Sequence, residues 1–172
     1  FKRDLRLTDH EPLVCALNAK EPILFLYIFE PSLLRHSNYS DMHWGFVWEA
    51  LMDLSGLIEK VGGGLRIACA VADDIFAQLS LDYEIKTVFS HAETGLKTTY
   101  TRDLALVAFM KKQGIAWKEY QQNGVVRRLK TRQSWQKEWY GFMSSGTANP
   151  DLTILKGSFL LDRTQIDKGL PY

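Results

Sequence analysis

The densest group of chemically active side chains lies in one short segment, residues 91–99. It supplies an imidazole, a carboxylate, three hydroxyls, an amine and a flexible glycine: His91, Glu93, Thr94, Gly95, Lys97, Thr98 and Thr99. A helix is expected to follow, and the free backbone N–H groups of its first turn favour an anionic or polar ligand. We therefore predict a binding site here. The alternative is that Thr98 or Thr99 caps the helix and the other residues form a solvated loop.

Other kinds of chemistry have little support in the sequence. The four histidines lie in separate predicted elements, and together with Cys15 and Cys69 they show no metal-ligand spacing. No Gly-x-Ser-x-Gly nucleophile motif occurs. The glycines at 62–64 follow a predicted helix, so they indicate a helix stop and not a phosphate-binding loop. We predict neither a metal site nor a catalytic residue in this chain.

Composition is typical of one globular domain, with 172 residues, 46% hydrophobic and 24% charged. The longest apolar run, Ile23 to Phe29, is far shorter than the roughly 20 residues that cross a bilayer. Both cysteines have apolar neighbours, which indicates reduced thiols and favours a cytoplasmic protein.

The net charge of +1 gives no general attraction for nucleic acid. A basic stretch at 127–132 could contact phosphates. The favoured alternative is that Trp135 and Trp139, spaced i and i+4, anchor a C-terminal helix on the core while the charges face solvent.

Strands and helices alternate along the chain. Apolar runs predict strands at 23–29, 65–71, 85–90 and 115–120, and apolar stripes predict helices at 11–19, 41–61, 74–81 and 98–112. Asp9 and Ser40 are the expected caps of the first two helices. This order predicts an α/β fold: a doubly wound, Rossmann-like, five-stranded parallel sheet with helices on both faces. The first strand would lie mostly before Phe1.

Ligands of such sheets bind beyond the carboxyl ends of the strands. The loops at 3–10, 29–40, 72–75 and 91–99 are therefore the candidate binding loops. The last predicted helix, 98–112, is expected to face the core with the stripe of Tyr100, Leu104 and Val107. Residues 1–143 form the predicted domain, and 144–172 have the composition of a linker.

Several motifs recur in the same order as in one known family. They are FKRDLRLTDH, LFLYIFEPSLL, HWGFVWEALMDLSGLIEKVGGGLRI, the helix containing YTRDL, and GVVRRLKTRQSWQKEWYGFM. Together they resemble the N-terminal α/β (photolyase-homology) domain of the DNA photolyase and cryptochrome family, in a bacterial branch. Lys2 and His10 depart from the family pattern, which has Arg and Asn at these positions.

The resemblance implies an antenna chromophore that passes excitation to FAD in a helical C-terminal domain not contained in this chain. The chain alone is then not expected to be catalytic. Its parent would be a light-dependent deoxyribodipyrimidine photolyase, a carbon–carbon lyase, or a signalling cryptochrome. The implied partners are that FAD domain and, only through the full-length protein, damaged DNA. No membrane partner is expected.

The resemblance also implies an antenna pocket. Tyr27, Phe29, Glu30 and His43 would form its wall, with Glu30 accepting from a ring N–H and Phe29 stacking. Arg6 is a further candidate for the cleft.

Folate-binding members carry an Asn-Glu pair where this chain has Thr98 and Thr99, so a deazaflavin or flavin is preferred over folate. Two alternatives stay open. One is a free-standing nucleotide-binding module of the universal-stress or electron-transfer-flavoprotein type, and the other is an empty antenna site with a purely structural role.

Overall fold

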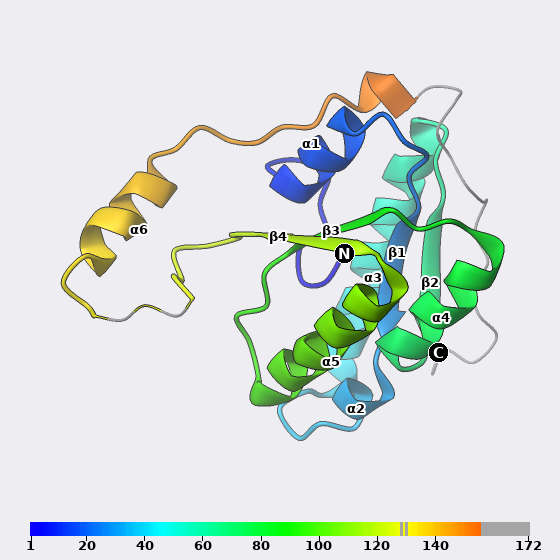
Figure 1. Ribbon diagram of the computed structural model, residues 1–172, viewed down its shortest axis with the longest axis horizontal. Helices are drawn as coiled ribbons and strands as arrows, with labels where there is room; N and C mark the ends of the chain where they lie inside the picture. The colour runs from blue at the N-terminus through cyan, green and yellow to red at the C-terminus, as the bar shows by residue number, and fades with distance from the viewer. Residues whose placement is uncertain (128, 130, 156–172) are drawn as a thin grey trace.

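The computed structural model describes residues 1–127, 129 and 131–155, which form an α/β fold (Figure 1). All four described strands pair in parallel, and each has five residues: β1 (Phe25–Phe29), β2 (Leu65–Cys69), β3 (Thr87–His91) and β4 (Ala116–Tyr120). β1 pairs with β2 and β3 pairs with β4. All four lie within or one residue from the strand ranges predicted from the apolar runs.

The two strand pairs are not hydrogen-bonded to each other within the described part of the chain. The α-ammonium of Phe1 donates to the Leu26 carbonyl at 2.9 Å, at the free edge of β1. Burial lowers the pKa of this ammonium. The predicted fifth strand is thus not among the described elements, and the sheet consists of two parallel pairs with a gap between β1 and β3.

Six α-helices and a 3-10 turn connect and follow the strands. They are α1 (Glu11–Asn18), α2 (Pro31–Leu34), α3 (Asp41–Lys60), α4 (Ala72–Asp82), α5 (Lys97–Gln113), α6 (Trp135–Met143) and η1 (Leu152–Leu155). Among these described helices, none is long and apolar enough to cross a membrane. Ser40 caps α3 as predicted, and Gly114 ends α5 in the left-handed conformation that glycine tolerates.

The cap of α1 differs from the prediction. His10, not Asp9, is the N-cap residue, and its Nδ1 accepts the Leu13 N–H at 3.1 Å. Asp9 instead has a positive φ of 47°, and it hydrogen-bonds to Ala148 and Asn149. A histidine ring nitrogen can replace the usual Asp or Ser oxygen because it offers an acceptor at a similar reach.

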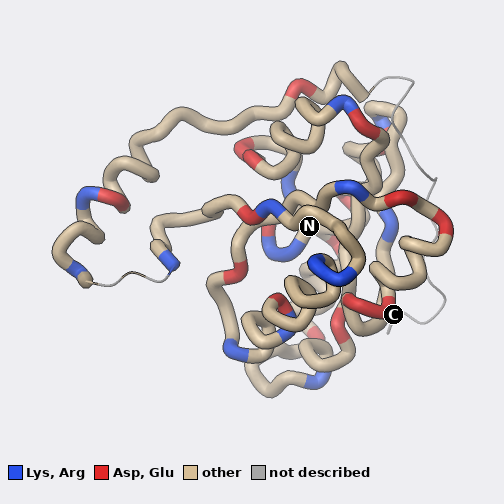
Figure 2. Tube along the Cα trace, in the orientation of Figure 1, with Lys and Arg blue, Asp and Glu red and all other residues tan. Residues whose placement is uncertain are grey.

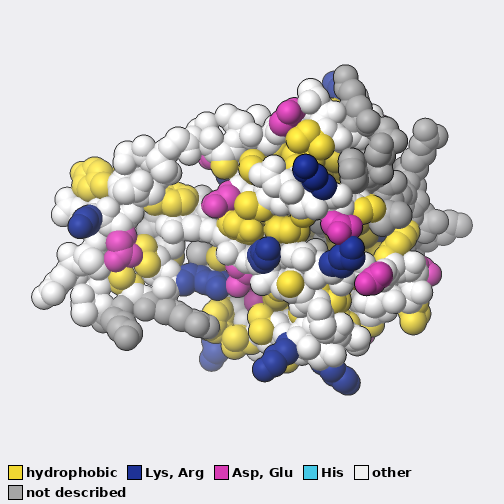
Figure 3. Space-filling view, turned by 45° about the horizontal axis from the view of Figure 1, so that its top comes forward, with side chains coloured by type: hydrophobic (Ala, Val, Ile, Leu, Met, Phe, Trp, Pro, Cys, Tyr) yellow, Lys and Arg dark blue, Asp and Glu magenta, His cyan; other side chains and the backbone are white. Residues whose placement is uncertain are grey.

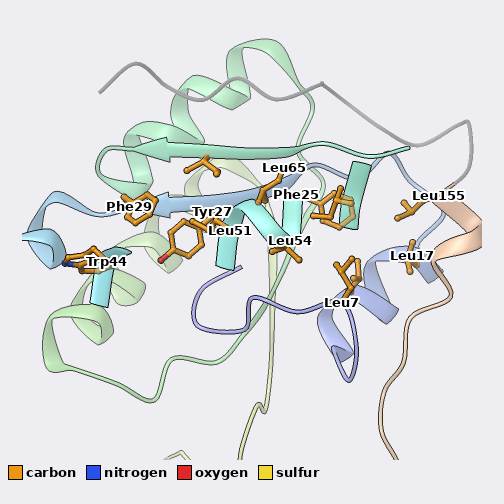
Figure 4. Close-up of a cluster of buried hydrophobic side chains, with 13 residues drawn as sticks. Leu7, Leu17, Phe25, Tyr27, Phe29, Trp44, Leu51, Leu54, Leu65 and Leu155 are labelled. Carbon is orange, nitrogen blue, oxygen red and sulfur yellow. The ribbon is translucent and has the colours of Figure 1, made fainter. Parts of the chain in front are cut away.

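Helices cover both faces of the strands, as predicted. One buried cluster joins β1 and β2 to α1 and α3, with Leu51, Leu54 and Ile58 fully buried on α3 (Figure 4). A second joins α4 and α5 to the other face through Leu79, Met110 and their neighbours. Burial of these apolar side chains is the main source of stability of the fold.

The buried face of α5 is not the predicted one. Tyr100, Leu104 and Val107 are 42 to 50% exposed. The helix instead buries Thr99, Asp103, Leu106 and Met110. The exposed stripe has helical spacing, but two polar residues occupy the inner face, so apolar periodicity alone selected the wrong side.

The segment predicted to be a linker packs against the domain as far as the structure describes it. Leu155 is fully buried within the α1 and α3 cluster. Asp9 N donates to Asn149 Oδ1 at 2.9 Å, and Ala148 N donates to Asp9 Oδ1 at 3.0 Å. The packed unit therefore extends through residue 155, beyond the predicted boundary at 143. The rest of the predicted linker, 156–172, lies outside the described residues.

Residues 121–150 form an arm that carries α6 away from the body of the domain (Figure 1). Hydrophobic side chains are exposed on this arm (Figure 3), including Trp135, Tyr140 and Met143. Its two branches meet where the Trp139 ring packs directly on Gly124, so closely that a Cβ there would overlap the ring. The prediction that Trp135 and Trp139 anchor this helix on the core is not met, since α6 has no buried residue.

Candidate functional site

A cavity of about 1020 Å³ runs along most of β1 and β3, from Pro22 and Glu84 before their amino ends to Glu30 and the first turns of α3. Six of the residues predicted for the site line it: Arg6, Tyr27, Glu30, His43, Glu93 and Thr99. The other four, Phe29, Thr94, Gly95 and Thr98, do not. The cavity therefore reaches the carboxyl ends of β1 and β3, where parallel sheets bind ligands.

Glu30 is the most informative residue of this cavity. It directly follows β1, is only 4% exposed, and its Oε1 has no hydrogen-bond partner among the described residues. The nearest cation, Arg102 Nε, lies 4.0 Å away. Burial raises the pKa of Glu30, more than Arg102 and a hydrogen bond from the Ala72 backbone lower it. A buried carboxylate oxygen without a partner is costly, and a ligand N–H could satisfy it.

Aromatic side chains form the wall beyond Glu30. Tyr39 lies against His43 and Trp44, with ring centroids 4.8 and 4.9 Å apart. Trp44 is 6% exposed, and its Nε1 has no acceptor among the described residues. Burial also raises the pKa of Tyr27, so its hydroxyl stays protonated at neutral pH. Such a wall suits a planar ring system.

Phe29 belongs to the core and not to the cavity wall. Its side chain is 1% exposed and contacts Tyr27 and Trp44 edge-on, at centroid distances of 5.0 and 5.9 Å (Figure 4). Phe29 shares a face of β1 with Phe25 and Tyr27, and all three belong to the buried cluster that includes α3. Phe29 supports Trp44 from behind, and does not itself face the cavity.

Residues 91–99 are largely engaged with one another. Glu93 pairs with Arg3, accepts the Gly95 N–H at 2.6 Å, and lies 3.5 Å from Arg102 Nη2. A Cβ at Gly95 would come within 3 Å of the Arg3 guanidinium and the Glu93 carboxylate. A side chain at this position would have to displace these charged side-chain ends, so glycine leaves room for the Arg3–Glu93 pair.

Neither threonine caps α5. The hydroxyl of Thr99 donates back to the Leu96 carbonyl at 2.7 Å, and Leu96 is the N-cap residue without a side-chain hydrogen bond. Thr94 lies 3.4 Å from the Asn123 amide, which links the loop to the arm. The helix N-terminus predicted as a ligand site thus has most of its side chains satisfied by protein.

Lys2, Arg102 and Asp103 line the cavity and belong to a chain of ion pairs. Figure 2 shows where the basic and acidic residues lie along the chain. Lys2 Nζ lies 2.7 Å from Asp103, which also accepts from Arg102, and 3.7 Å from Glu119. Arg127 completes the chain by binding Glu119 at 2.9 Å. Sequence reasoning missed Lys2 as a cleft residue. Its partners Asp103 and Glu119 lie far away in the sequence, so no local sequence pattern connects them with Lys2.

Arg6 is held within its own loop. Its guanidinium donates to the carbonyls of Thr8 at 3.1 Å and Asp9 at 2.9 Å. It still borders the cavity. These hydrogen bonds shape the loop before α1, so Arg6 positions the first loop at the rim.

Two of the four histidines converge on one carboxylate, although they were predicted to lie apart. Asp4 Oδ2 lies 2.5 Å from His91 Nδ1 and 3.1 Å from His10 Nε2, and all three side chains are buried. Burial alone raises the pKa of Asp4, but the hydrogen bonds from His10 and His91 outweigh it and lower the pKa well below its usual range.

This cluster has the donor types of a metal site, but the His10 cap argues against one. Since His10 Nδ1 accepts a backbone N–H, the proton of its neutral ring lies on Nε2 and points toward Asp4. A metal at Nε2 would need that proton removed or the cap broken. Asp4, His10 and His91 are therefore best described as a buried hydrogen-bonded triad that ties the first loop to β3.

The chain is similar in sequence to cryptochromes of the DASH type. It is 31% identical to the chloroplastic and mitochondrial cryptochrome DASH of Arabidopsis thaliana over 100 residues, which are 55% of this chain and 18% of that protein. It is 28% identical to the cryptochrome DASH of Synechocystis over 98 residues, 54% of this chain and 20% of that protein. The chain thus spans about a fifth of the length of these relatives.

Solved structures show the same fold. A bacterial class III photolyase from Agrobacterium tumefaciens superposes with a TM-score of 0.74 at 23% identity, over 96% of this chain and 36% of that one. An archaeal photolyase from Sulfolobus tokodaii, described with two FAD molecules, gives 0.69 at 19% identity over 95% and 37%. The family model of DNA photolyase matches residues 1–142. The chain therefore belongs to the DNA photolyase family.

Proposed function

We propose that this chain is the antenna-binding domain of a light-dependent flavoprotein, and that the antenna is a flavin or deazaflavin. The bound chromophore would absorb light and pass the excitation to FAD held by a separate domain of the same protein. The family membership supports the general role, and the cavity at the carboxyl ends of β1 and β3 supports the binding site.

The single observation that carries this proposal is the buried, unpartnered Oε1 of Glu30 in the wall of that cavity. A ring N–H would supply the missing hydrogen bond, and Tyr27, Tyr39 and His43 would contact the ring. The site would thus recognise a planar heteroaromatic group through one polar edge. Buried groups with fixed neighbours favour a single orientation of the chromophore, which directional energy transfer requires.

Membership of the DNA photolyase family does not favour the free-standing nucleotide-binding module as an alternative. The loop after β3 also carries a single glycine, Gly95, and its backbone N–H is used by Glu93. A phosphate-binding loop needs several free N–H groups. We therefore do not carry that alternative further.

The test is a titration of the purified protein with FMN, an 8-hydroxy-5-deazaflavin and a reduced folate, followed by ligand fluorescence and absorbance. We expect one of the first two to bind more tightly than about 100 µM, which corresponds to about −5.5 kcal/mol. Folate should bind more weakly. Absence of binding by all three, in this chain and in the full-length protein, would refute the antenna role.

The proposed partners are the FAD-binding domain of the same protein and, through it, damaged DNA. They are tested by excitation spectroscopy of the full-length protein. Antenna absorption should appear in the excitation spectrum of FAD emission, and should be lost in a variant whose antenna pocket is blocked by Ala50→Trp, since Ala50 lines the cavity on α3. Ser80→Trp on α4, away from the cavity wall, is the matched control.

A further inference from the structure

Helix α6 carries an apolar face that is largely open among the described residues. Trp135, Trp139 and Met143 share this face at helical spacing, and Tyr140 lies beside it. Trp135, Tyr140 and Met143 are 43, 57 and 55% exposed, and no residue of the helix is buried. Isolated helices shorter than about 12 to 15 residues are marginal in water, and α6 has nine. A further surface is therefore expected to pack against this helix.

The arm that carries α6 is tied to the body of the domain on both of its branches. On the outgoing branch, Arg127 binds Glu119 of β4 at 2.9 Å. On the returning branch, the Ala148 carbonyl accepts the His10 N–H at 2.7 Å. These contacts hold the helix away from the body (Figure 1), so the surface that covers its apolar face is expected to come from elsewhere.

The outgoing branch also contacts the loop after β3, next to the cavity. Asn123 Nδ2 lies 3.4 Å from Thr94 Oγ1, and Arg127 donates to the Glu93 carbonyl at 3.4 Å. The Glu93 side chain lines the cavity. A domain that receives excitation from a chromophore in this cavity has to lie near it, and therefore near the arm.

The arm is part of a fold that longer proteins share. The superposition on the class III photolyase covers 96% of this chain but 36% of that one. The uncovered 4% amounts to about seven of the 172 residues, so most of the arm, residues 121–150, lies within the shared fold. The greater part of the longer protein is thus available to pack against it.

We propose that the apolar face of α6 is the docking surface for the FAD-binding domain of the same protein. This inference rests on the proposed antenna function, which requires that domain, and goes beyond it by assigning the surface that the domain contacts. Trp135 and Tyr140 are the anchors, because large aromatic side chains contribute most of the binding energy at protein interfaces. An apolar face favours a protein partner over nucleic acid, and the charge of Arg127 is already used by Glu119.

The first experiment identifies the partner by photo-crosslinking in the full-length protein. With p-benzoylphenylalanine in place of Tyr140, irradiation should link α6 to residues of the FAD domain. Leu81 is the matched control position, because it is 86% exposed at the end of α4, on the opposite edge of the sheet, and should give no such link. A link from position 140 to a second copy of the chain, or to an added single-stranded oligonucleotide, in place of the FAD domain would overturn the proposal.

The second experiment measures how well the contact protects α6. Lys137 is exposed on this helix, so trypsin should cut the 172-residue chain there quickly and the full-length protein slowly. Trp135→Ala in the full-length protein should raise the cleavage rate about 30-fold, the factor that corresponds to the loss of an aromatic hot spot. Leu81→Ala should keep the protection. Equal cleavage of the 172-residue chain and the full-length protein would contradict the docking.

The outcomes separate this inference from the antenna function. If the full-length protein transfers excitation but position 140 gives no link to the FAD domain, the antenna function stands and the docking surface is wrong. If the link forms but no chromophore binds the cavity, the docking stands and the antenna function falls. If the full-length protein contains no FAD domain, both fall.

Discussion

His91 Nδ1 donates to Asp4 Oδ2 at 2.5 Å across 87 positions of sequence, and both side chains are almost fully buried. His10 lies 3.1 Å from the same oxygen, and the Lys2 N–H donates to the other carboxylate oxygen at 2.6 Å. One carboxylate thus holds the first loop, the start of α1 and the end of β3 together. Lys2 and Arg3, which form ion pairs with Asp103 and Glu93, directly precede Asp4 in the same loop.

Replacing Asp4 by Asn should strongly destabilise the fold. Removing one member of a buried charged network costs about 3 to 5 kcal/mol, because its partners stay buried. The pKa of Asp4 is lowered in the folded state, so its stabilisation is present above the unfolded pKa of about 3.9 and is lost as the pH falls below it. The difference between wild type and variant, measured by urea unfolding, should therefore be large at pH 7 and smaller at pH 3. Asp53→Asn, on the exposed side of α3, serves as the control. It should leave the stability unchanged at both pH values.

Glu30 should show the opposite pH dependence. Its pKa is raised in the folded state, so the group favours folding below its unfolded pKa of about 4.3 and loses that contribution as the pH rises through the folded value. Glu30→Gln without ligand should thus raise stability by about 1 kcal/mol at pH 8 and by little at pH 4. Thermal unfolding at both pH values measures this, with the exposed Glu49→Gln as control. A loss of stability at pH 8 would show that the Ala72 hydrogen bond and Arg102 outweigh the cost of burying the Glu30 carboxylate.

Leu155 should behave as a core residue. It is fully buried among α1 and α3, so Leu155→Ala should cost about 2 to 5 kcal/mol, whereas the 42% exposed Ile154→Ala should cost much less. A chain ending at residue 143 should be destabilised to a similar or larger extent. Equal stability of Leu155→Ala and Ile154→Ala in urea would instead support the linker predicted from composition.

Gly124→Ala should separate the two branches of the arm. The added methyl would overlap the Trp139 ring, so the indole must move into solvent and its fluorescence should shift to longer wavelength. Gly141→Ala is the matched control, because nothing lies within 4 Å of its Cβ position and alanine favours a helix by up to about 1 kcal/mol. That variant should keep the wild-type emission. An unchanged spectrum in Gly124→Ala would contradict the contact.

Local pattern was sufficient to predict most of the fold. Long apolar runs marked β1 and β2, because strands covered on both faces contain few polar residues, and Ser40 marked the start of α3. Local periodicity did not predict the buried face of α5, which includes Asp103. That burial depends on Lys2 and Arg102, a long-range pairing that no helical period reports.

The site was predictable only in part, for a related reason. Glu30, Tyr27 and His43 were predicted from the family resemblance, and all three line the cavity. Trp44 was not singled out, because an aromatic residue on an apolar stripe reads as core. The triad of Asp4, His10 and His91 joins three separate segments, and only tertiary structure brings them together.

The gap between β1 and β3 has a consequence for how the domain unfolds. In the described part of the chain β1 and β3 are not hydrogen-bonded to each other, and the segment before α1 bridges them, through Phe1 N to the Leu26 carbonyl and Asp4 to His91. The halves can then open as separate cooperative units, each with its own exchange rate for backbone amides. Amides of β1 and β2, packed on the long helix α3, should stay protected after those of β3 and β4 have exchanged with deuterium. Ligand access to the cavity between β1 and β3 would then depend on how often these two halves separate.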